Sequence, residues 1–304
     1  MQLRQLLVVI DPSQPSQPAL QRALWLARAT SAKVELLLCE YNSALMHSLI
    51  FDNDTLTNAR EAMLASLHAD LEAIAAPLRE EGLQVTVQVR WGKPLEQVIL
   101  QRVAELKPDL LLKSTHQHHS LKQRLLGNSC WQLLRHCPVP LWLVKNGDLP
   151  YHKLCAALDP LHAADKPAAL DQQLIAAAQL LSASLGIQPH YLHSYAAVPQ
   201  SLLFDSALVN DYEHYRELSA TQHREAFEQL LRKTGVPHSQ GQLREGFAEE
   251  EITRFVRAEH IDLLLIGAIS RSHLANAFIG NTAERVLESV DCDLLILKAP
   301  VANC

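Results

Sequence analysis

The stretch "DLLLIGAIS", from Asp262 to Ser270, decides the fold of this chain because it occurs twice. Its counterpart is "DLLLKSTHQ", from Asp109 to Gln117. With an offset of 153 residues and no gap, ten of the 37 positions in the range 109–145 are identical, where chance would give roughly two or three. An internal match of this length indicates that the chain is a duplication.

The repeat extends upstream, with small changes of offset. "LLVVIDP" (Leu6 to Pro12) matches "LCAALDP" (Leu154 to Pro160) at an offset of 148, and "RWG" at 90–92 answers "REG" at 244–246. Between the halves, "NGDLPYH" at 146–152 carries the Gly, Asp and Pro that favour a short turn. We therefore predict two related domains, 1–147 and 153–304.

Each half alternates continuous apolar runs with segments of helical periodicity. Strands are expected near 6–11, 33–39, 85–89, 109–112 and 140–145, and again near 153–158, 187–194, 239–244, 262–266 and 293–298. Five strands alternating with four helices predict an α/β fold, with one parallel, doubly wound, Rossmann-like sheet in each half. Such sheets bind ligands at the carboxyl ends of their strands.

The last strand of each predicted sheet is an edge, and exposed edges must be covered or paired. We predict that "PLWLVK" (140–145) and "DLLILK" (293–298) pair with each other. The two domains would then form an internal pseudo-dimer.

Bulk composition excludes several classes of protein. The 304 residues suit two domains, and the net charge of −6 argues against nucleic-acid or anionic-membrane partners. The sequence has no run of about 18 apolar residues, so no membrane span is predicted. The cytoplasm is therefore the expected location. The six cysteines include no CxxC pair, which favours buried thiols over a disulfide framework.

The residues between Gly267 and Thr282 have the features of an anion site. A strand that ends in glycine and feeds a helix start offers unpaired backbone N–H groups, and Asn281 or Thr282 adds a side-chain donor. The pattern is neither a P-loop nor GxGxxG. The alternative is structural: Gly267 turns the chain, and Gly280-Asn281 caps a helix.

Taken together, these motifs resemble the tandem type of the universal stress protein family. Its nucleotide-binding members carry G-x2-G-x9-G-(S/T) after strand four, and Gly267-x2-Ser270-x9-Gly280-Asn281 is similar, with serine at the second glycine and Asn-Thr at the end. The resemblance implies a fold like that of the adenine-nucleotide alpha-hydrolases and a role in stress survival without turnover. It also implies that ATP, with Mg²⁺, is the candidate ligand. The implied nucleotide residues are Asp159, Gly267, Ser270, Gly280, Asn281 and Thr282.

The first domain departs further from that pattern. Ser114 and Gln117 stand where the first two glycines would be, so we expect this domain to have lost nucleotide binding. The weaker candidates that remain are Asp11, Lys113, Gly127, Asn128 and Ser129. Lys113 replaces an apolar strand residue, and its ammonium is expected either in a structural ion pair or against an anionic ligand.

Other functions stay open at this point. His116, His118 and His119 lack a nearby Cys or carboxylate, so no metal site is predicted. No local signature of a Ser-His-Asp or Cys-His arrangement occurs, so no catalytic residue is proposed. Slow ATP hydrolysis, or a carrier or sensor of a lipid-like or anionic metabolite, are the alternatives. A small-molecule ligand and a homodimer are the expected partners.

Overall fold

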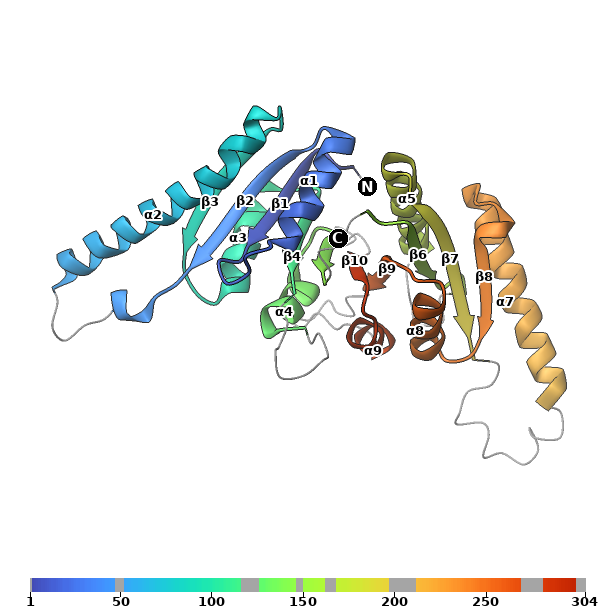
Figure 1. Ribbon diagram of the computed structural model, residues 1–304. Coiled ribbons are helices and arrows are strands. Elements are labelled where there is room, and N and C mark those ends of the chain that lie inside the picture. The colour runs from blue at the N-terminus through green and yellow to red at the C-terminus, as the bar shows by residue number, and fades with distance from the viewer. Residues whose placement is uncertain are drawn as a thin grey trace. The chain divides into compact units, whose positions relative to one another are not determined.

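The computed structural model describes residues 2–46, 52–115, 126–145, 150–161, 168–196, 212–268 and 281–298. The chain divides into two compact units, Gln2–Gly147 and Asp148–Cys304. Each unit is an α/β domain built on a five-stranded sheet (Figure 1). The described part of the chain contains no helix long and apolar enough to cross a membrane.

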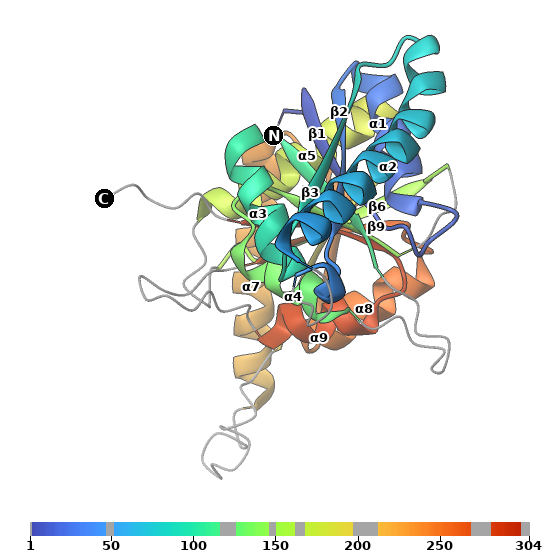
Figure 2. The ribbon, with the colours of Figure 1, turned by 90° about the vertical axis from the view of Figure 1, so that its left-hand side faces the viewer.

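The first unit alternates strands and helices throughout. Its strands are β1 (Gln5–Ile10), β2 (Lys33–Glu40), β3 (Val85–Trp91), β4 (Leu110–Ser114) and β5 (Leu141–Val144). Its helices are α1 (Pro18–Thr30), the short 3-10 helix η1 (Ser43–Leu45), α2 (Asn53–Glu80), α3 (Leu95–Leu106) and α4 (Asn128–His136). The long helix α2 runs along β3 within this unit (Figure 2).

The second unit repeats the same order of elements. Its strands are β6 (Lys153–Leu158), β7 (Gln188–Tyr195), β8 (Gly241–Glu245), β9 (Leu263–Ala268) and β10 (Asp293–Lys298). Its helices are α5 (Ala168–Leu185), α7 (Tyr212–Thr234), the 3-10 helix η3 (His238–Gln240), α8 (Ala248–Ala258) and α9 (Asn281–Ser289).

Both sheets have the same strand order and are parallel throughout. The first runs β3-β2-β1-β4-β5, and the second runs β8-β7-β6-β9-β10. The chain moves outward from β6 to β8, then returns to β9 on the other side of β6. Strand order therefore reverses between β6 and β9, and between β1 and β4 in the first unit. Right-handed crossovers therefore place α5 and α7 on one face of the second sheet and α8 and α9 on the other. Helix α8 packs against α9, as α3 packs against α4 in the first unit.

The duplication is visible in the lengths and registers of the elements. Helices α4 and α9 each have nine residues and begin 153 residues apart, at Asn128 and Asn281. Strands β1 and β6 each have six residues and begin 148 residues apart. The prediction of two tandem Rossmann-like α/β domains is confirmed. The pairing of the two edge strands, and with it the pseudo-dimer, stays a prediction.

One duplicated aspartate clamps the first strand of each unit. A carboxylate oxygen of Asp109 accepts hydrogen bonds from the backbone N–H groups of Arg4 and Gln5 at 2.8 and 2.9 Å. The equivalent oxygen of Asp262 accepts from His152 and Lys153, also at 2.8 and 2.9 Å. The repeated "DLLL" thus begins with a residue that aligns the central strand.

Replacing Asp262 with alanine is expected to cost about 1–3 kcal/mol, because two backbone donors at the start of β6 lose a charged acceptor. Asp109→Ala should have a similar effect on the first unit. Asp70→Ala, at an exposed position on α2, is the control and should stay within about 0.5 kcal/mol. Urea unfolding followed by circular dichroism measures all three, and equal midpoints would contradict the clamp.

The described cysteines are thiols, and most are buried. Cys130, Cys137, Cys155 and Cys292 belong to the core, and Cys39 is half-buried. Burial raises the pKa of the Cys39 thiol to about 12, and it also raises the pKa of Cys155. Thiols in this state are weak nucleophiles at neutral pH, as expected for cysteines that serve packing.

Candidate functional site

The predicted site falls at the carboxyl edge of the second sheet, where strand order reverses. Asp159 directly follows the end of β6, and Gly267 is the penultimate residue of β9. The register pairs Ala156 with Leu265, so the ends of the two strands lie side by side. Because a parallel sheet brings its carboxyl ends to one edge, Asp159 and the end of β9 share that edge.

The other predicted residues of this unit are described only in part. Ser270 and Gly280 lie outside the described residues. Asn281 and Thr282 form the first two positions of α9, and the placement of their side chains is likewise outside what the structure describes. Residues at a helix start leave their N–H groups without intrahelical partners. Together, β9 and α9 thus frame the predicted anion loop.

The peptide group between Leu158 and Asp159 is held from both sides by buried polar side chains. The carboxylate of Asp171, which is 0% exposed, accepts from the Asp159 N–H at 3.2 and 3.3 Å. On the other side, Nδ1 of His193 lies 3.0 Å from the Leu158 carbonyl oxygen. His193 is 2% exposed. The peptide that presents Asp159 is therefore positioned by side chains from α5 and β7.

His193 continues into a cluster of rings between β7 and α7. Its Nε2 lies 2.8 Å from Nδ1 of His223. The His223 ring stacks on Tyr195, with centroids 4.5 Å apart and planes 17° apart, and Phe227 closes the cluster against His193 at 5.8 Å. Burial lowers the pKa of His223, while the negative charge of Asp159 opposes that shift. His223 is thus electrostatically connected to the predicted site.

Sequence reasoning missed Asp171 and His193. Asp171 was visible as the one charged residue in the otherwise neutral segment "AALDQQLIAAAQLLSASL" of α5. A charge alone in an apolar helix is expected to be buried with a partner. His193 sits on an inner strand of the sheet, where polar residues are equally unusual. The sequence at these two positions, however, does not indicate which backbone group each side chain contacts.

In the first unit, the carboxylate of Asp11 is engaged by its own loop. Ser13 donates to it through its N–H at 3.0 Å and its hydroxyl at 2.7 Å, and the Gln14 side-chain amide donates at 3.0 Å. The amide of Gln17 bonds both the N–H and the carbonyl of Asp11. The partly exposed, neutral Gln17 thus bonds the Asp11 N–H as Asp171 bonds that of Asp159, but its other bond goes to the carbonyl of Asp11 itself and not to that of the preceding residue.

The remaining candidates of the first unit are also engaged with backbone or helix. The hydroxyl of Ser114 accepts from the N–H of Ala19 in α1 at 3.1 Å, and the buried Lys113 ammonium donates to the Ser114 carbonyl at 3.0 Å. Gly127 precedes α4 with a φ of −67°, a conformation open to any residue. Asn128 and Ser129 begin that helix. His116, His118, His119 and Gln117 lie outside the described residues.

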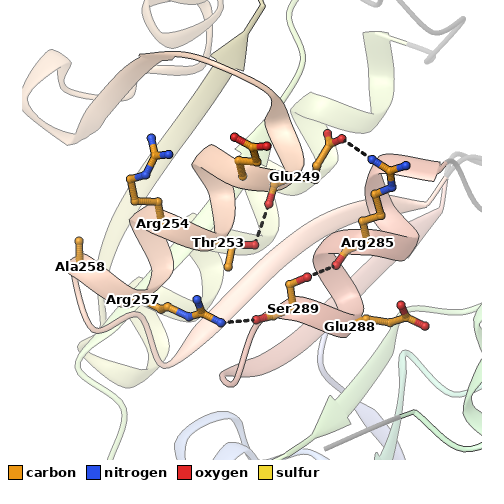
Figure 3. A pocket seen from close by; sticks show the side chains of 9 residues that line it. Glu249, Thr253, Arg254, Arg257, Ala258, Arg285, Glu288 and Ser289 are labelled. Carbon is orange, nitrogen blue, oxygen red and sulfur yellow. Dashed lines mark hydrogen bonds and ion pairs between the residues drawn. The ribbon is translucent and has the colours of Figure 1, made fainter. Parts of the chain in front are cut away.

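A groove of about 850 Å³ lies elsewhere on the second unit, between α8 and α9 (Figure 3). Three arginines and three glutamates line it, so its walls carry both positive and negative charges. Arg285 pairs with Glu249 at 3.0 Å, and Arg257 donates to the carbonyl of Ser289 at 3.1 Å. The groove contains none of the predicted nucleotide residues. Within the described residues, no group of three or more His, Cys, Asp or Glu side chains is placed to hold a metal ion.

Comparison with known proteins agrees with the duplicated fold. The universal stress protein family model matches the chain twice, at residues 2–145 and 150–298. The chain is 30% identical over 299 residues to universal stress protein E of Salmonella typhi, covering 96% of this chain and 93% of that one. It is 25% identical over 304 residues to the universal stress protein E homolog of Haemophilus influenzae, covering 98% of both.

Solved structures give the same result. A universal stress protein from Pseudomonas aeruginosa UCBPP-PA14 superimposes with a TM-score of 0.77 at 27% identity, covering 98% of this chain and 94% of that one. One from Archaeoglobus fulgidus reaches 0.62 at 14% identity over 98% and 99%, a likeness of fold. Two family matches in one chain, each on a complete five-stranded unit, confirm the resemblance: the chain belongs to the universal stress protein family and is a tandem member of it.

Proposed function

We propose that the second unit binds ATP at the reversal point between β6 and β9 and that the first unit does not. The observation that carries this proposal is the placement of Asp159 beside the end of β9. Open α/β sheets bind their ligands where strand order reverses, and the Gly267–Thr282 segment that leaves this point carries the family's nucleotide pattern.

The chemistry of the edge suits a nucleotide. The carboxylate of Asp159 is an acceptor for the hydroxyl or amino groups of a nucleoside. The start of α9 and the glycines of the preceding loop offer backbone N–H groups and partial positive charge to phosphates. Mg²⁺ would accompany the phosphates with oxygen and water ligands. Serine at 270 in place of glycine is expected to limit affinity, because a Cβ crowds a loop that approaches phosphate.

The first unit supports the other half of the proposal. The Asp11 carboxylate, which corresponds to that of Asp159, is already bonded to Ser13 and Gln14. A ligand would have to displace these contacts, which costs about 1 kcal/mol or more for each lost hydrogen bond. We extend the proposal: the chain is a cytoplasmic, non-catalytic stress protein that binds the nucleotide without turnover.

Titration calorimetry with Mg-ATP on the full chain tests this proposal. Asp159→Asn should weaken binding about tenfold, the effect of losing a charged acceptor worth about 1.4 kcal/mol, and Asp11→Asn is the matched control. Stoichiometry should be one ATP per chain, with no phosphate release above background. Two bound nucleotides, or equal losses in the two variants, would contradict the assignment to the second unit. Native mass spectrometry of freshly purified protein distinguishes bound nucleotide from an apolar adduct.

A further inference from the structure

We propose that Asp171, His193 and His223 form a positioning chain that holds Asp159 in the second unit and makes anion binding there depend on pH. The inference rests on the proposed nucleotide site but concerns residues that the family pattern does not include. It starts from the single peptide group, Leu158–Asp159, whose two polar atoms are both bonded to buried side chains.

The hydrogen-bond partners determine the tautomers. The Leu158 carbonyl can only accept, so Nδ1 of His193 carries a proton. With that imidazole neutral, its Nε2 is an acceptor, and Nδ1 of His223 must donate to it across 2.8 Å. The lone pair of the neutral His223 is therefore on its Nε2. The chain runs without a break from the Asp171 carboxylate through the peptide and His193 to His223.

Burial determines which ring of the pair carries an added proton. A proton on Nε2 of His223 leaves both hydrogen bonds of His193 intact. A proton on Nε2 of His193 would also keep the bond, because Nδ1 of His223 could then accept, but His193 is 2% exposed and His223 is half-buried, so desolvation disfavours the charge on His193. His223 is therefore the group of the pair that becomes cationic first, and its charge appears beside Asp159.

The charged surroundings of His223 come from several elements. Asp159 follows β6, Asp171 lies on α5, and His193 and Tyr195 lie on β7. Farther out, Arg216 of α7 forms a two-bond ion pair with Glu245 of β8 at 2.7 and 3.1 Å, and Arg224 also acts on Tyr195. The charges of Arg216 and Glu245 largely offset each other. The acid whose charge acts on His223 is Asp159.

The sign of the pH effect follows by linkage. Burial lowers the pKa of free His223 below its usual range, so the ring is mostly neutral at pH 7.5. A nucleotide bound at this edge adds negative charge to the site, which favours the imidazolium and raises this pKa again. The affinity for an anion should therefore increase as pH falls through the pKa of the bound state, and level off below the pKa of the free state. A shift of one pKa unit corresponds to about a tenfold change in affinity.

The test has two independent parts. In the ligand-free protein, long-range ¹H–¹⁵N NMR should show both rings as Nδ1–H tautomers at pH 7.5, with His223 titrating below pH 6.5. An Nε2–H tautomer for His193 overturns the proposal. This part needs no nucleotide, so it tests the hydrogen-bonded positioning chain even if the wild-type protein binds no ATP. Absence of ATP binding would refute only the proposed function.

Mg-ATP calorimetry at pH 7.5 and 5.5 gives the second part. Both proteins experience the same titration of ATP itself. Lowering the pH from 7.5 to 5.5 should therefore strengthen Mg-ATP binding about tenfold more in wild type than in His223→Gln. His193→Leu should weaken binding about tenfold. His193→Asn should restore it, because the Asn amide can donate where Nδ1 does. Equal pH ratios in wild type and His223→Gln, or His193→Asn as weak as His193→Leu, would refute the positioning role.

Discussion

Replacing Arg102 with methionine should lower the free energy of unfolding of the first unit by about 3–5 kcal/mol, the usual cost of leaving a buried charge without its partner. Glu35 lies on β2, between β1 and β3, and is 4% exposed. Arg102 of α3 bonds both of its carboxylate oxygens, at 2.7 and 2.6 Å. The hydrogen bond to Glu35 raises the pKa of Arg102, so its guanidinium stays charged at any accessible pH.

The second unit provides a matched control for this variant. Glu35 is the third residue of β2, and the third residue of β7 is His190. Opposite it, Phe255 occupies the place of Arg102, and the His190 and Phe255 rings meet edge to face at 5.9 Å. Burial lowers the pKa of His190, which keeps it neutral. One copy thus has an ion pair where the other has an aromatic contact.

Transplanting the aromatic pair should therefore restore most of the lost stability. The double variant Glu35→His/Arg102→Phe is expected to be more stable than Arg102→Met, because it removes both charges together. Arg28→Met is the surface control: its ion pair with Glu81 is half exposed, so the change should stay below about 1 kcal/mol. Guanidinium unfolding by fluorescence measures these differences. Equal losses for Arg102→Met and Arg28→Met would show that burial does not set the cost.

Alanine at Gly92 or Gly246 should destabilise its unit by about 2–3 kcal/mol, through backbone strain and crowding. These glycines have φ values of +154° and +149°. Their N–H groups bond the carbonyls of Glu40 and Tyr195 at 3.0 and 2.8 Å, so the backbone cannot turn away without losing that bond. An added Cβ would lie 2.9 Å from Val98 in one copy and 2.7 Å from Glu251 in the other.

Gly82→Ala separates strain from crowding. Gly82 has a φ of +88°, and nothing lies within 4 Å of an added Cβ. Its substitution should cost only about 1 kcal/mol. Thermal unfolding of the three variants is the measurement, and a loss at Gly82 as large as at Gly92 would show that the close contacts are irrelevant.

Much of the fold could be read from the sequence because it depends on local periodicity and on the repeat. Continuous apolar runs predicted inner strands such as β1 and β4, since strands buried on both faces must be apolar along their whole length. Alternation at Val85, Val87 and Val89 predicted β3, and the repeat predicted its counterpart β8. The offset of 153 residues predicted that α9 begins where α4 does. The same reasoning located Asp159 and Gly267 at strand ends, because strand ends follow from where apolar runs stop.

What the sequence by itself determined is therefore the class of fold, its duplication, the family and the position of Asp159 and Gly267 at one edge of the sheet, where the ligand site is predicted. Only the tertiary structure decided which side chains support that edge. The clamp on the Leu158–Asp159 peptide joins α5, β6 and β7, and the Glu35–Arg102 pair joins residues 67 positions apart. Contacts of this kind depend on how separate elements pack, and neither composition nor spacing along the chain encodes the direction in which a buried polar side chain finds its partner.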